Sequence, residues 1–194
     1  TVTNGHATTG AGIYASGHDT VTLANCQVID NHHGNNGCNG AGAYFNGGSV
    51  LIANTTFADN SASYGGGSIG YAAGISAHSV NMIIVDSLFR SNSLENIVVR
   101  DGEGGGAIWA NHGTLAVTNT TFVGNRGNQA SVNTRGGGAC FLKGTLTATF
   151  KNCAFVGNVC AAPDAPTRIP AGGAMNIAVS SGYSVTLENC SIGH

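Results

Sequence analysis

Apolar and polar residues alternate with a period of two in six short segments of the chain. In each segment every second residue is apolar, which is the pattern of a β-strand that buries one face. No 3.6-residue periodicity competes with it, so the pattern predicts strands and not helices. The six segments begin at Val21, Val50, Met82, Leu115, Ala148 and Val185.

An anchor residue, Asn or Asp, ends each segment. Asparagine tolerates the left-handed backbone that a sharp corner needs, so we expect the chain to turn at each anchor. The anchors lie 29 to 37 residues apart, and in the first five copies a closing Asn follows six residues later. The anchors are Asn25, Asn54, Asp86, Asn119, Asn152 and Asn189, and the closing residues are Asn31, Asn60, Asn92, Asn125 and Asn158.

Aligning the copies on their anchors gives three columns that are apolar throughout, and we expect all three to point inward. The column two residues before the anchor reads Leu23, Ile52, Ile84, Val117, Phe150 and Leu187. The column four residues before it reads Val21, Val50, Met82, Leu115, Ala148 and Val185. The column three residues after it reads Val28, Phe57, Phe89, Phe122, Phe155 and Ile192.

A Gly-rich motif alternates with the anchored motif, at residues 10–14, 40–44, 66–69, 105–109, 137–141 and 172–175. It predicts a further strand in every copy. Its inward column would be Ile13, Ala43, Ile69, Ile108, Cys140 and Met175. Its next, outward position would be Tyr14, Tyr44, Gly70, Trp109, Phe141 and Asn176.

One such unit cannot bury its own apolar side, but units stacked at about 4.8 Å can, and they pair their backbones from coil to coil. The sequence therefore predicts an all-β, single-stranded parallel β-helix of about six coils. The anchors would form an Asn ladder that Asp86 interrupts. We expect one domain over residues 1–194.

Composition narrows the class of protein. Only 8% of the residues are charged, 31 of 194 are glycine, and the net charge is −2. Clustered Lys and Arg are absent, which argues against nucleic-acid partners. No apolar run is long enough to insert into a membrane as a helix. Low charge together with six cysteines favours an extracellular or cell-surface location.

The cysteines allow several pairings. Cys153 and Cys190 share the position after the anchor in neighbouring copies and are the first candidates for a disulfide. Pairs Cys26–Cys38 and Cys140–Cys160 come next, and unpaired buried thiols stay an alternative. The anchors Asn54, Asn119 and Asn189 begin glycosylation sequons, but we expect them to be buried in the ladder and unmodified.

The repeats resemble those of a known family. The motif Gly105-Gly106-Ala107-Ile108 and four Phe-x-x-Asn copies, at residues 57–60, 89–92, 122–125 and 155–158, carry the likeness. They look like the GGA-I and FxxN repeats of polymorphic outer-membrane-protein-type adhesins. The resemblance implies a right-handed parallel β-helix and a surface role in adhesion or assembly.

Few residues suggest chemistry. Four aromatic residues in the outward position, Tyr14, Tyr44, Trp109 and Phe141, would form an exposed stripe that binds a protein or a glycan, unless loops bury it. Two groups of polar residues are further candidates. Asp30 and Asp59 could form a carboxylate pair, and the adjacent histidines His32 and His33 could bind a metal, but in each case a solvated surface is the simpler interpretation.

These patterns predict a structural or adhesive solenoid with no catalytic site, metal or cofactor. Its partners would be copies of itself stacked end to end or neighbouring surface proteins, and possibly glycans. The chain would be a filament subunit or a segment of a larger surface protein. The alternatives are a polysaccharide lyase or hydrolase on this scaffold and an ice-binding protein, for which the outward threonines are too irregular.

Overall fold

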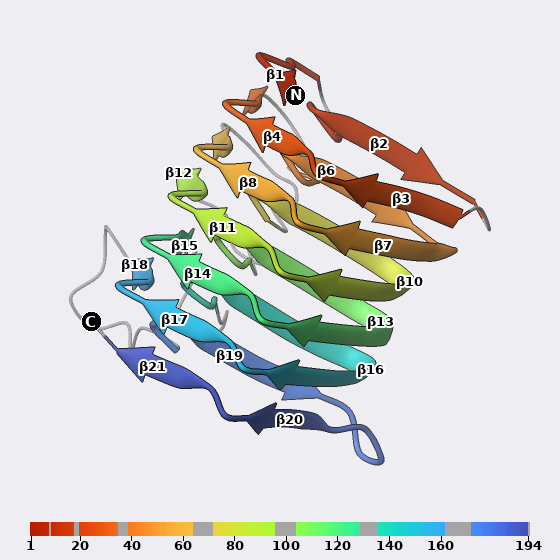
Figure 1. Cartoon of the computed structure of the whole chain (residues 1–194), viewed down its shortest axis with the longest axis vertical. Coiled ribbons are helices and arrows are strands. Elements are labelled where there is room, and N and C mark those ends of the chain that lie inside the picture. Colours follow the sequence, from red (N-terminus) through yellow and green to blue (C-terminus); the bar gives the residue numbers. More distant parts are fainter. Residues whose placement is uncertain are drawn as a thin grey trace.

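A computed structural model of the chain describes residues 1–7, 9–17, 20–34, 39–63, 72–95, 104–128, 136–161 and 172–193. Every regular element in these ranges is a β-strand, and the paired strands run parallel in three sheets. The chain rises from coil to coil along one axis, with the N-terminus at one end and the C-terminus near the other (Figure 1). The prediction of an all-β parallel solenoid is confirmed.

The largest sheet contains the Gly-rich strands and the strands that precede the anchors. In the middle coils these two strands merge into one long strand. The nine strands are β2 (Ile13–Ser16), β3 (Thr20–Ala24), β6 (Ala43–Asn46), β7 (Ser49–Ala53), β10 (Ile75–Val85), β13 (Ile108–Thr118), β16 (Cys140–Lys151), β19 (Met175–Val179) and β20 (Val185–Glu188).

Each coil has two corners, one at the anchor and one at the closing Asn, and the strands after each corner form a narrower sheet. The seven-stranded sheet, after the anchors, contains β1 (Val2–Thr3), β4 (Gln27–Ile29), β8 (Thr56–Ala58), β11 (Leu88–Arg90), β14 (Thr121–Val123), β17 (Ala154–Val156) and β21 (Ser191–Gly193). The five-stranded sheet, after the closing Asn residues, contains β5 (His32–Gly34), β9 (Ser61–Ser63), β12 (Ser93–Glu95), β15 (Arg126–Asn128) and β18 (Val159–Ala161).

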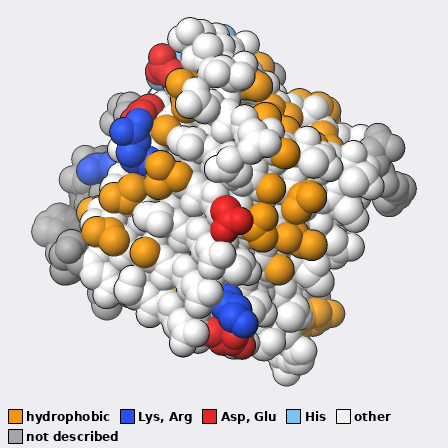
Figure 2. Space-filling model, viewed as in Figure 1, with side chains coloured by type: hydrophobic (Ala, Val, Ile, Leu, Met, Phe, Trp, Pro, Cys, Tyr) orange, Lys and Arg blue, Asp and Glu red, His pale blue; other side chains and the backbone are white. Residues whose placement is uncertain are grey.

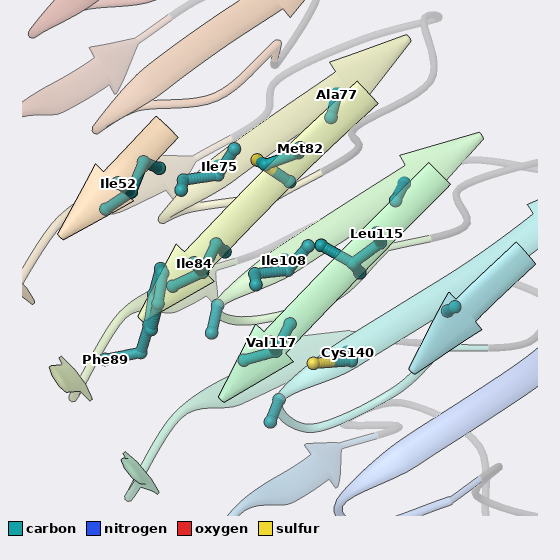
Figure 3. Packing of buried hydrophobic residues seen from close by; sticks show 14 of the residues in the cluster. Ile52, Ile75, Ala77, Met82, Ile84, Phe89, Ile108, Leu115, Val117 and Cys140 are labelled. Atoms are coloured by element: carbon teal, nitrogen blue, oxygen red, sulfur yellow. The ribbon is translucent and has the colours of Figure 1, made fainter. Parts of the chain in front are cut away.

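The strand register confirms the three columns predicted from the anchors. Ile84, for example, pairs with Ile52 on one side and Val117 on the other. The phenylalanines after the anchors stack in the same way, with ring centroids 5.1 Å apart for Phe57 and Phe89. Apolar side chains from the facing parts of each coil meet in the interior (Figure 3).

The Gly-rich column is confirmed except in its third copy. The residue that pairs with Ala43 and Ile108 is Ile75, which follows Gly74 and is buried. The expected residues Ile69 and Gly70 are outside the described ranges. The outward position of this coil is consequently Ser76.

Two Asn ladders run along the solenoid. The predicted one, at the anchors, is exposed: Asn54 Nδ2 donates to Asn25 Oδ1 at 2.7 Å, and Asn119 Nδ2 donates to Asp86 Oδ1 at 3.0 Å. The anchors have the expected left-handed backbone, with φ of 56° at Asn25. The expectation that they are buried, on which the argument against glycosylation depended, is wrong.

The buried ladder is formed by the closing residues. Asn60 Nδ2 donates to Asn92 Oδ1, and Asn92 Nδ2 donates to Asn125 Oδ1, both at 2.9 Å. Each amide also bonds the backbone; Asn92 Nδ2, for example, donates to Phe57 O. Because its polar atoms are paired, this ladder can stay in the interior at little cost.

The expected number of about six coils needs a correction. All six anchored segments stack in register, but the solenoid with a closed, fully buried core has about four coils, within residues 43–155. The first and last copies are partly open. Leu23 is half-buried and Leu187 is 38% exposed, because the strands that carry them, β3 and β20, each pair with one other strand only among the described residues.

Candidate functional site

The aromatic stripe expected on the outer face is exposed at one end only. Tyr14 is 58% exposed, and its ring stacks on that of Tyr44 with centroids 5.5 Å apart. Trp109 and Phe141 are 1% and 0% exposed and form a small cluster with Ala72, apart from the main core. The prediction of four exposed aromatic residues is therefore wrong for these two, and a binding role for Tyr14 and Tyr44 stays a prediction.

A histidine that the sequence did not single out joins the two parts of this stripe. The ring centroid of His78 lies 5.7 Å from that of Tyr44 and 4.4 Å from that of Trp109. Burial, followed by the nearby His112 and Lys143, lowers the pKa of His78 from 6.5 to about 4. The imidazole is therefore neutral near pH 7 and packs as an aromatic ring.

The cysteines after the anchors hydrogen-bond the backbone in place of the expected disulfide. Cys153 and Cys190 are free thiols whose Sγ atoms donate to the carbonyls of Lys151 and Glu188, at 3.3 and 3.4 Å. Thr120 uses its hydroxyl in the same way, towards Thr118 O at 2.9 Å. This position therefore favours a short side chain with one donor, which Cys, Ser and Thr all provide.

The other predicted pairs do not form among the described residues. Cys26 and Cys140 are free thiols, and Cys160 is 5% exposed. Cys38 lies outside the described ranges. Burial raises the pKa values of the Cys140 and Cys153 thiols, which makes these groups poor nucleophiles.

The carboxylates Asp30 and Asp59 occupy equivalent corners of adjacent coils, with φ of 56° and 54°. Each one has a cationic or imidazole neighbour: His32 Nε2 lies 2.9 Å from Asp30 Oδ1, and Arg90 donates to Asp59 Oδ2 at 3.0 Å. Because each carboxylate interacts with its own neighbouring side chain, nothing in this arrangement favours a site in which Asp30 and Asp59 act together.

The adjacent histidines do not act together. His32 and His33 are consecutive in β5 and point to opposite faces, with His33 only 1% exposed. Among the described residues no group of three or more His, Cys, Asp or Glu side chains could hold a metal ion.

An ice-binding protein would need a regular array of threonines on the outer face of the nine-stranded sheet. Charged side chains are few on the face shown in Figure 2, and two groups of hydrophobic side chains interrupt the polar surface. Leu51 and Ile83, 38% and 50% exposed, stand in the column where Thr22 and Thr149 stand in other coils. The threonine array is therefore discontinuous, as expected from the sequence.

The two ends of the solenoid expose its interior. At the N-terminal end a cavity of about 360 Å³ opens where β2 passes to β3. Its lining combines apolar residues of the first two coils with glycines and polar groups: Tyr14, Ala15, Ser16, Gly17, Val21, Phe45, Gly47 and Val50. At the C-terminal end the exposed apolar residues are Ile177, Tyr183, Leu187 and Ile192.

No family model matches the chain, and comparisons with curated proteins and with solved structures found no significant match. Within the described residues there is also no helix that could cross a membrane.

Proposed function

We propose that the chain is an extracellular structural or adhesive solenoid that stacks end to end, as a filament subunit or as a segment of a larger surface protein. The observation that carries the proposal is the exposure in the last coil, and the partial exposure at Val21 and Leu23 in the first, of residue columns that are buried in the middle. Each end surface therefore presents apolar side chains of the interior columns and strand edges that other coils pair with.

The C-terminal end exposes apolar residues of the interior columns. Ile192 is 61% exposed, whereas Phe155, its partner in the preceding coil, is 0% exposed. Among the described residues, nothing pairs with the outer edge of β19, β20 and β21, and this edge is a template for a further parallel strand. Apolar burial contributes about 25 cal/mol per Å², so covering this surface favours association.

The two ends complement each other at one corner. The cavity at the N-terminal end lies between β2 and β3, where the first coil turns. The corresponding turn of the last coil joins β19 to β20, with Val179 and Val185 packed partly against the core and Tyr183 42% exposed beside them. In a stack in which β19 and β20 pair with β2 and β3 of the next copy, this turn would lie over the cavity.

Other features support a surface role. Charged side chains are few, at 8% of the sequence and on the face shown in Figure 2, and the GGA-I and FxxN motifs resemble those of surface adhesins. Neither alternative has a favourable observation, because Asp30 and Asp59 are each engaged with a different neighbour and the threonine array is discontinuous.

Sedimentation velocity of the 194-residue chain over a range of concentrations tests the proposal. We expect the wild type to form larger species as concentration rises, and the double variant Leu187→Lys/Ile192→Lys to stay monomeric. The control is Ile83→Lys, a residue of similar exposure on the outer face, which should associate like the wild type. A wild-type chain that stays monomeric at high concentration, or equal disruption by Ile83→Lys, would contradict the proposal.

A further inference from the structure

A serine, a histidine and an aspartate form a hydrogen-bonded chain at the corner between the seven-stranded and five-stranded sheets. His32 Nδ1 lies 2.7 Å from Ser61 Oγ, and His32 Nε2 lies 2.9 Å from Asp30 Oδ1. Ser61 stands directly beside His32 in the next coil, and Asp30 stands two residues before it in the same coil.

Both contacts are satisfied together by one tautomer of the imidazole. When Nε2 carries the proton and donates it to the Asp30 carboxylate, Nδ1 is left as an acceptor for the Ser61 hydroxyl. In this arrangement the carboxylate orients the base and the base accepts the serine proton, which is the division of roles in a nucleophile–base–carboxylate triad.

The backbone around this chain is held by the buried ladder. Asn31, between Asp30 and His32, is 0% exposed, and its side chain donates to Asn60 Oδ1 at 2.9 Å. The backbone N–H of Ser61 donates to Asn31 O, and that of His32 donates to Gly5 O, both at 3.0 Å. The His6 ring lies 5.8 Å from that of His32 on the side away from Ser61. The three functional groups therefore project from a rigid frame.

We propose that Ser61 is an activated nucleophile that accepts acyl groups from small carboxylic esters, with His32 as general base and Asp30 as its positioning residue. Ser61 Oγ forms a bond to the carbonyl carbon of the ester while its proton passes to His32 Nδ1. The bond from that carbon to the leaving oxygen then breaks, protonated His32 returns the proton to that oxygen, and the alcohol or phenol departs. Water later hydrolyses the acyl-serine and releases the carboxylic acid. This activity is independent of end-to-end stacking.

The site is open to solvent, with side-chain exposures of 41% for His32 and 54% for Asp30. The N–H of Ser61 is already used in coil-to-coil pairing, so it does not serve as an oxyanion donor. The acceleration therefore comes from the base, which typically contributes about 10²–10⁴-fold.

The chain provides a matched control in Ser93. This serine pairs with Ser61 one coil further along, is also half-buried, and has Ser61 and Arg126 as its neighbours in place of a histidine. A comparison of the two serines within one molecule therefore isolates the effect of His32.

The experiment treats the full 194-residue chain with p-nitrophenyl acetate and follows acetylation of each serine by peptide mass spectrometry, together with release of p-nitrophenolate. We expect Ser61 to be acetylated about 10²-fold faster than Ser93. Acetylation of Ser61 should be lost in His32→Gln and slowed about 10-fold in Asp30→Asn, while Ser93→Ala leaves it unchanged. Circular dichroism and a thermal melt of each variant check that the fold is intact.

Two results would overturn the proposal. One is acetylation of Ser61 at the rate of Ser93 or at an unchanged rate in His32→Gln, which would make the hydrogen bond a surface contact only. The other is p-nitrophenolate release that persists at the full rate in Ser61→Ala, which would mean that His32 attacks the ester by itself.

Discussion

The middle coils and the last coil have the same sequence pattern and the same strand register, but only the middle coils bury their apolar columns completely. Phe89 and Phe122, at the centre of their column, are 0% exposed, whereas Ile192 in the last coil of that column is 61% exposed. The difference does not lie in the residues, because all three are large and apolar.

The comparison shows that a side chain in this protein is buried by the neighbouring coils and not by its own coil. Each coil covers the next, so stability is a sum of contacts between neighbours, and a coil with one neighbour receives about half of them. Any surface that covers the end coils, whether of a second copy or of further coils, would restore the missing half.

The largest expected difference between the two regions is the cost of removing an aromatic side chain. Phe89→Ala removes a ring stacked between those of Phe57 and Phe122, and we expect it to lower the free energy of unfolding by about 3–5 kcal/mol. Ile192→Ala should cost less than about 1 kcal/mol, since most of its side chain already faces water. Urea unfolding followed by circular dichroism measures both, and equal losses would contradict the distinction between regions.

The two Asn ladders give the next contrast. Asn92→Ala removes the acceptor of the Asn60 backbone N–H and side-chain amide and the donor to the carbonyl of Phe57 inside the core, which should cost about 2–4 kcal/mol. Asn119→Ala loses two exposed hydrogen bonds, one to Asp86 and one from Asn152, and a residue type suited to φ of 50°, for about 1 kcal/mol. If unfolding in urea shows Asn119→Ala to be the costlier change, the buried ladder is not the more important one.

The pH dependence of stability should report on His78. Its folded-state pKa of about 4 is below the unfolded value of 6.5, so the unfolded chain binds the proton more readily. Stability is then complete above about pH 6.5 and falls by on the order of 2–3 kcal/mol as pH drops towards 4. Urea midpoints at pH 7 and pH 4.5 measure the loss, and His78→Gln should flatten this part of the profile. An identical profile in that variant would exclude His78 as the cause.

The smallest effect concerns the interruption of the exposed ladder. The Asp86 carboxyl group accepts a hydrogen bond from Asn119 but has no N–H to donate to Asn54. Asp86→Asn supplies that donor, and we expect the free energy of unfolding to rise by about 0.5–1 kcal/mol. A lower melting temperature for this variant would show that the carboxylate contributes something that the amide does not replace.

Much of the fold was predictable because a β-solenoid repeats its constraints. The alternation around the anchors placed Ile84, Phe89 and Val117 in the interior correctly, since every coil has to present an apolar residue at the same place. The Gly-rich strand of the third copy was misplaced because residues 65–75 fit the motif in two registers. Only the pairing of Ile75 with Ala43 and Ile108 distinguishes them.

The functional features were harder to predict because they depend on contacts between coils. Alternation alone placed Trp109 and Phe141 outside, and nothing in their own strands indicates that they are buried. The hydrogen bond from Ser61 to His32 joins residues 29 positions apart and appears only when the register of β5 and β9 is known. Similarly, Cys153 was placed in the right column, but its bond to Lys151 O was not foreseen.

The central claim, that uncovered inner faces at the ends bind one another, is tested most directly by electron microscopy of the concentrated chain. We predict unbranched rods with the width of one solenoid and a strand spacing of about 4.8 Å along the rod axis. Separate particles of single-chain length, at concentrations where the fold is intact, would contradict it.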